Sequence, residues 1–157
     1  MSISLPYDAF TLDNGLRVIV HEDHRAPVAC VDVWYHVGSL DEKRGRTGFA
    51  HLFEHLMFMG TPAVPDIDVA YGAVGVEANA STWDDHTLYY ARGMSSALPL
   101  ILSVEADRMA NQGAGISKDT LWSYVVGGMA FNEQEAPQMG AGPGGTNKGA
   151  WRGCEFR

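Results

Sequence analysis

Two histidines and a glutamate lie close together in the stretch His51-Leu52-Phe53-Glu54-His55. On an α-helix, residues four apart lie about 40° apart around the axis, so the rings of His51 and His55 project from one face. Glu54 falls about 60° to the other side of His51 and stays on that face. Neutral imidazoles are common zinc ligands, and a carboxylate beside the metal can accept a proton from water. The spacing H-x-x-E-H therefore predicts a zinc site that activates water for hydrolysis.

The simpler interpretation is a helix that carries two histidines by coincidence. Such a match should arise in roughly one chain in a hundred of this composition. The helix is predicted to begin near Thr47-Gly48 and to run to about Met59, where Gly60-Thr61-Pro62 ends it. Its remaining residues are mostly apolar, so it is expected to be largely buried. Because buried polar side chains without partners are costly, this setting favours a bound metal.

Length and composition predict one globular domain. A chain of 157 residues can bury a single core, and 46% hydrophobic against 19% charged residues is typical of a globular protein. The net charge of −8 argues against a nucleic-acid partner, which would require a basic face. No stretch is expected to span a membrane. Two cysteines are too few for a disulfide framework, and Cys30, in an apolar run, is expected to be buried.

Alternating apolar residues predict strands near the amino terminus. Phe10-Thr11-Leu12 and residues 16–20 flank Asp13-Asn14-Gly15, a turn signal between two extended segments. Residues 28–37 are predicted to form a long strand whose apolar face suits packing against helices. That face consists of Ala29, Val31, Val33, Tyr35 and Val37.

The middle of the chain predicts a second hairpin and further helices. Residues 76–82 and 86–92 are expected to pair as strands around Trp83-Asp84-Asp85. The predicted helices are residues 66–72, residues 98–109 and a segment from Ser117 to at least Glu133. The near-helical apolar spacing in residues 98–109 comes from Leu98, Ile101, Leu102, Glu105 and Met109. The expected fold is α+β, a mainly antiparallel sheet with helices, the motif helix among them, packed on one face.

Several blocks of sequence resemble one known family. They are residues 38–42 with 45–61, which contain the motif, then Asn79-Ala80-Ser81-Thr82-Trp83-Asp84-Asp85-His86-Thr87-Leu88-Tyr89, and Glu105-Ala106-Asp107-Arg108-Met109. The second block is similar to N-A-x-T-x-x-D-x-T-x-Y, and Phe10 to Val20 is similar to T-L-x-N-G-L-x-V. Together they resemble the amino-terminal domain of the pitrilysin/insulinase family of zinc metallopeptidases, which includes the mitochondrial processing peptidases. The order H-x-x-E-H marks the inverzincin class.

The resemblance implies a role for each residue that matches the motif. His51 and His55 would bind one Zn²⁺ per chain, and Glu54 would be the general base that deprotonates water. A catalytic zinc usually takes three protein ligands, and the family supplies the third from a glutamate roughly 75 residues after the second histidine. Glu133 lies at that distance, and Glu135 is the neighbour that an error of register would select.

The resemblance also implies a peptide-binding edge. Asn79 and Ala80 lie where relatives present a strand edge that pairs with the substrate backbone, a mode called β-augmentation. The alternative for Asn79 is an ordinary turn residue.

Residues 1–138 are expected to form the peptidase amino-terminal domain, incomplete relative to the family, and the glycine-rich residues 139–157 a disordered tail. The implied function is a zinc-dependent endopeptidase domain that acts on peptides or unfolded segments. The alternative is a non-catalytic binding or assembly subunit, or an inactive fragment, because relatives are longer and a second peptidase-like domain or subunit would supply the missing half. The location would be cytoplasmic if the chain is complete as given, and periplasmic if a signal peptide was removed.

Overall fold

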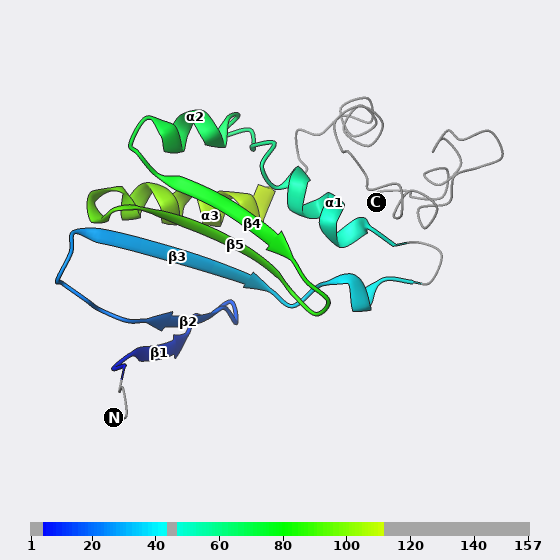
Figure 1. Cartoon of the computed structure of the whole chain (residues 1–157), viewed down its shortest axis with the longest axis horizontal. Coiled ribbons are helices and arrows are strands. Elements are labelled where there is room, and N and C mark those ends of the chain that lie inside the picture. The colour runs from blue at the N-terminus through cyan, green and yellow to red at the C-terminus, as the bar shows by residue number, and fades with distance from the viewer. Residues whose placement is uncertain (1–4, 44–46, 112–157) are drawn as a thin grey trace.

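The computed structural model describes residues 5–43 and 47–111 of the chain. The strands are β1 (Asp8–Thr11), β2 (Arg17–Val20), β3 (Val28–Tyr35), β4 (Glu77–Thr82) and β5 (Thr87–Met94). The helices are α1 (Phe49–Leu56), α2 (Ile67–Gly72) and α3 (Leu98–Asn111), with short 3₁₀ turns η1 (Ser39–Asp41) and η2 (Ser95–Ala97). Antiparallel sheets combined with helices confirm the predicted α+β class (Figure 1).

β1 and β2 form the first antiparallel hairpin, as the Asn-Gly turn predicts. Gly15 has φ of 91°, a left-handed conformation that glycine adopts without a Cβ penalty. The Leu12 N–H donates to the Leu16 carbonyl at 2.9 Å, which closes the turn. The hairpin is a separate two-stranded sheet from the one that supports α1.

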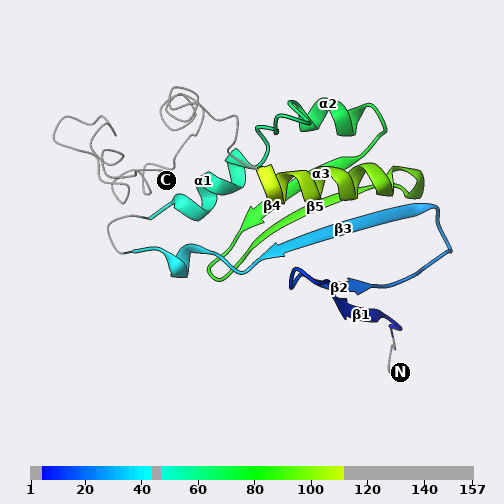
Figure 2. The same ribbon diagram turned by 180° about the vertical axis from the view of Figure 1, so that it is seen from behind.

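The larger sheet has three antiparallel strands in the order β3-β5-β4. β5 lies in the centre, so among the described residues β4 has a strand neighbour on one side only. α3 lies behind this sheet in Figure 1 and in front of it in Figure 2, which shows that it covers one face. Within this sheet, α3 contacts β3 and β5.

Side chains of β3 alternate between the helix-covered face and the open face. The partly buried residues are Ala29, Val31, Val33 and Tyr35, as predicted. Val37 lies beyond the end of the strand and is exposed. The prediction that Cys30 is buried is wrong, because the period of two places it on the open face.

The hydrophobic core joins α2, α3 and the centre of the sheet. It consists of Ile67, Tyr71, Val76, Ala91, Ala97, Ile101 and Val104. The buried face of α3 differs from the predicted one, because Leu102 and Met109 are exposed while Val104 and Arg108 are buried. Residues 101, 104, 105 and 108 follow the i, i+3, i+4, i+7 spacing of a single helix face.

The carboxyl-terminal predictions cannot be followed in the structure. The predicted helix from residue 117, the boundary at residue 138 and the glycine-rich tail lie outside the described residues. Within residues 5–43 and 47–111, each helix is too short or too polar to cross a membrane.

Candidate metal centre

The motif helix α1 begins at a position fixed by Glu42. The Gly48 N–H and the Ala50 N–H each donate to a different oxygen of the Glu42 carboxylate, both at 2.7 Å. These bonds satisfy two amide groups that the first turn leaves unpaired, and the negative charge is favourable at a helix amino terminus. Gly48, the N-cap residue, has φ of 94°, which favours glycine at that position.

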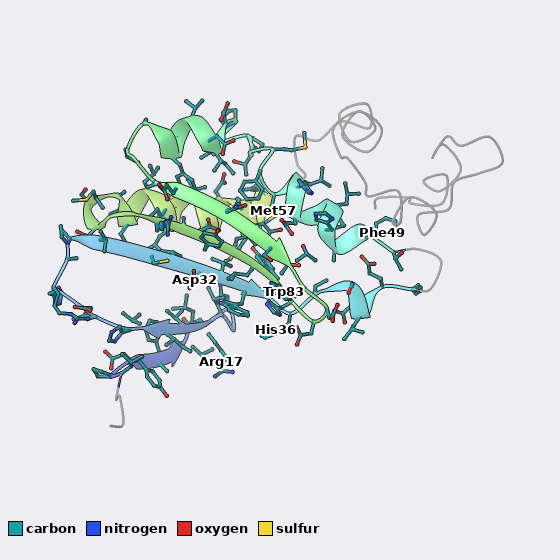
Figure 3. All side chains as sticks on the ribbon, in the orientation of Figure 1. Arg17, Asp32, His36, Phe49, Met57 and Trp83 are labelled. Carbon is teal, nitrogen blue, oxygen red and sulfur yellow. The ribbon has the colours of Figure 1, made fainter. Side chains whose placement is uncertain are left out.

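The helix is shorter than the predicted span of residues 47–59. It covers Phe49–Leu56, after which the Phe58 N–H and the Met59 N–H bond to carbonyls three residues back. Such tighter bonds are typical of a last helical turn. Phe49 and Met57 mark the two ends of this segment in Figure 3.

The two imidazoles converge as the spacing predicts. Nε2 of His51 lies 3.0 Å from Nε2 of His55, and the ring centroids are 4.7 Å apart. Two nitrogens that bind one tetrahedral zinc ion at 2.0–2.1 Å would lie roughly 3.3 Å apart. Burial, together with the neighbouring His51, lowers the pKa of His55 despite the opposing effect of Glu54, and the neutral form is the one that binds a metal. The two imidazoles are therefore spaced as two ligands of one zinc ion would be.

Glu54 lies on the side of α1 that contacts β4. The hydroxyl of Thr82, the last residue of β4, donates to Oε2 of Glu54. The carboxylate is thus held beside the two imidazoles from a different element of the fold.

A third metal ligand is not found in the part of the chain that the structure describes. Within that part, no group of three or more His, Cys, Asp or Glu side chains could hold a metal ion. Glu133 and Glu135, the predicted candidates, lie outside the described residues.

Ala80 lies on the open edge of β4, the edge that has no strand neighbour among the described residues. The Trp83 N–H donates to the His86 carbonyl at 2.8 Å, and hydrogen-bonded pairs alternate along an antiparallel ladder. This alternation directs the backbone of Asn79 toward β5 and the backbone of Ala80 toward the open edge. The Ala80 N–H donates to Oδ1 of Asn79 at 2.8 Å. A peptide that pairs with this N–H must therefore displace the Asn79 side chain.

Sequence comparison identifies the family. The family model described as Insulinase (Peptidase family M16) matches residues 17–117, well over half of the chain. The chain belongs to the insulinase, or M16 peptidase, family.

Individual relatives agree with this assignment. An uncharacterized zinc protease of Mycobacterium tuberculosis is 44% identical over 103 residues, which are 64% of this chain and 24% of the relative. The beta subunit of the mitochondrial-processing peptidase of Bos taurus is 35% identical over 106 residues, 66% of this chain and 21% of that subunit. The crystal structure of a protease from Helicobacter pylori matches with a TM-score of 0.69 at 32% identity, covering 74% of this chain and 28% of that one. The chain thus spans about a quarter of the length of its curated relatives.

A buried ion pair of α3 contacts the end of the motif helix in this M16 domain. Arg108 and Glu105 of α3 are 2% and 4% exposed, and Nη2 of Arg108 lies 2.6 and 2.5 Å from the two Glu105 oxygens. The Arg108 guanidinium also donates to the Met57 carbonyl, at the end of α1, at 3.5 Å. It lies 4.8 Å from the Tyr89 ring centroid, and the Tyr71 hydroxyl donates to Glu105 at 3.2 Å. The pair thereby joins α1, α2, α3 and β5.

The cavity beside α1 lies away from the two imidazoles. A cavity of about 530 Å³ is lined by Phe49 and Phe53 of α1, by Met57 directly after this helix, and by residues of β3 and β5. Helical geometry places these three side chains on the face away from His51 and His55. The cavity and the two imidazoles therefore lie on opposite faces of the helix.

The structure brings together three of the residues predicted from the motif, His51, Glu54 and His55, and places Ala80 at an open strand edge. Two further residues, Thr82 and Arg108, contact the site or its helix without having been predicted from the sequence. Thr82 belongs to the N-A-x-T-like block, and Arg108 follows Glu105 at i+3 on an otherwise apolar helix face. These positions indicated that each side chain has a hydrogen-bonding partner, but the sequence did not show that the partners are Glu54 and the Met57 carbonyl.

Proposed function

We propose that this M16-family chain is a zinc-dependent endopeptidase domain that hydrolyses peptide bonds of peptides or unfolded segments. The observation that supports the proposal is the 3.0 Å approach of the two Nε2 atoms on the same helix face as Glu54. A zinc ion held there would polarise the scissile carbonyl and lower the pKa of a bound water.

Each predicted site residue has one role in this proposal. His51 and His55 bind the metal, and Glu133 from outside the described residues completes the ligand set. Glu54 accepts the proton of the attacking water and returns it to the leaving amine. The Ala80 N–H, at the open edge of β4, pairs with the substrate backbone once the Asn79 amide oxygen has moved away. Backbone pairing does not depend on side-chain identity, so tolerance for varied sequences is expected.

The second candidate function is a non-catalytic binding or assembly subunit. It is favoured by a relative that is named as a subunit, the beta subunit of the mitochondrial-processing peptidase. In either case we propose that this domain pairs with a second peptidase-like domain or subunit.

The test measures the rate at which the zinc-loaded 157-residue chain hydrolyses an unstructured peptide, and compares it with the rate of the Glu54→Gln variant. Loss of the general base should reduce the rate at least about a hundredfold while zinc content stays unchanged. The exposed Glu22→Gln variant is the matched control and should cleave like the wild type. Zinc-loaded wild type that cleaves nothing would support the subunit function instead.

A further inference from the structure

The end of β4 and the motif helix meet through one hydrogen bond. Thr82 Oγ1 donates to Oε2 of Glu54, although the two residues are 28 positions apart. Both side chains are partly buried, so water competes for this bond less than at an exposed site. A β-branched threonine has restricted χ1 rotation, which fixes the direction of its hydroxyl once the backbone is fixed.

The backbone at Thr82 is anchored on both sides. Thr82 pairs with Thr87, which is 5% exposed and whose hydroxyl donates to the Val37 carbonyl at 2.9 Å. The following residue, Trp83, accepts from the Ser39 N–H at 3.1 Å. A Cβ on Gly38 would meet the carbonyl oxygens of residues 83 and 84 at 2.4 Å, so the two segments are packed backbone to backbone. The hydroxyl of Thr82 is therefore presented from a rigid support.

A glutamate side chain has three rotatable bonds and must lose their freedom before it can work as a base. The bond from Thr82 restricts the rotation of the Glu54 side chain and takes up one acceptor site of Oε2, whereas no side-chain hydrogen bond among the described residues reaches Oε1. We propose that Thr82 is the positioning residue of the general base and that it assigns the proton of the attacking water to Oε1. The inference rests on the proposed function.

The same strand also carries the proposed substrate edge. Ala80 and Thr82 are two residues apart on β4, so their side chains share a face and their backbone groups share the open edge. A peptide paired along this edge and the carboxylate of Glu54 would thus be placed by one rigid element. The distance between base and scissile bond would then be set by the register of the added strand.

The test compares Thr82→Val, which keeps the shape and removes the hydroxyl, with Thr82→Ser, which keeps the hydroxyl. Thr82→Val should lower kcat about tenfold to a hundredfold with KM and zinc affinity unchanged, because the bond involves a charged acceptor. Thr82→Ser should restore most of the wild-type kcat. Thr11→Val, at an exposed strand position, is the matched control and should change nothing.

A spectroscopic measurement on the metal-free chain tests the contact without activity. The ¹³C carboxyl resonance of Glu54, assigned by its loss in Glu54→Gln, should shift in Thr82→Val and stay in place in Thr82→Ser and Thr11→Val. Thr82→Ala replaces the valine variant if thermal unfolding shows that valine disturbs the fold. The inference is overturned if the hydroxyl-free variant keeps the wild-type resonance, or if serine behaves like valine. Wild type that binds zinc but does not cleave would contradict the proposed function alone, and the resonance would still decide the role of Thr82.

Discussion

Gly60 shows how a single residue shapes the exit from the motif helix. Its φ of 83° is left-handed, and a Cβ at this position would meet the Pro65 carbonyl oxygen at 2.4 Å. The chain therefore turns here because the residue has no side chain, and the turn directs residues 61–65 back toward α3. There Thr61 donates to the Asp107 carboxylate, which ties the turn to the helix behind it.

Replacement of Gly60 by alanine should destabilise the fold. Both the backbone conformation and the contact with Pro65 oppose a Cβ, so we expect a loss of roughly 2 kcal/mol or more in the free energy of unfolding. Gly72→Ala is the matched control, because Gly72 has open space around its Cβ position and ends a helix. Urea unfolding should leave Gly72→Ala within about 1 kcal/mol of the wild type. Equal midpoints for the two variants would contradict this interpretation of Gly60.

Among the elements, α3 does more than cover the sheet. Arg108 of its buried pair with Glu105 donates to the Met57 carbonyl at the carboxyl end of α1, where a cation is favourable. This contact holds the end of the helix that carries His55 against α3. Replacing only one partner of such a pair leaves a buried charge without compensation. The pair itself is local, but its bonds to other elements are long-range: 51 positions separate Arg108 from Met57, and 34 separate Glu105 from Tyr71.

Arg108→Met should cost about 3–5 kcal/mol of unfolding free energy, because Glu105 would remain buried and unpaired. The double variant Glu105→Leu/Arg108→Met removes both charges and should recover at least half of that loss. Arg92→Met breaks the exposed pair with Glu77 and, as the control, should change stability by less than about 1 kcal/mol. Urea unfolding of the three variants measures the differences, and a double variant no more stable than Arg108→Met would argue against the pair as described.

The elements were largely predictable from the sequence, and their partners were not. Period-two alternation in residues 28–35 gave the helix-covered face of β3, and the Asn-Gly turn gave the first hairpin, because both signals are local. The prediction for Cys30 was wrong because it used only the apolar character of the run, which does not determine the face of the sheet on which a residue lies. The bond between Thr82 and Glu54 depends on how β4 meets α1, and no local pattern contains that information.

At the scale of the whole molecule, the motif predicted that His51, Glu54 and His55 lie close together, but not whether they are enough to retain a zinc ion. The described residues supply two imidazoles and a base, while Glu133 lies outside them and the chain spans about a quarter of its relatives. The family assignment, with relatives named zinc protease, supports a metal in this family. Whether this chain holds one by itself is therefore the central question.

Zinc content of the purified 157-residue chain answers it most directly. After expression with zinc and extensive desalting, mass spectrometry of the metal should find about one zinc ion per wild-type chain, because a tetrahedral site with three protein ligands retains its metal. The His51→Ala/His55→Ala variant should retain far less, and His24→Ala, which changes an exposed imidazole, should match the wild type. Folded wild-type chain that emerges without zinc, or a double variant that keeps as much zinc as the wild type, would contradict the account.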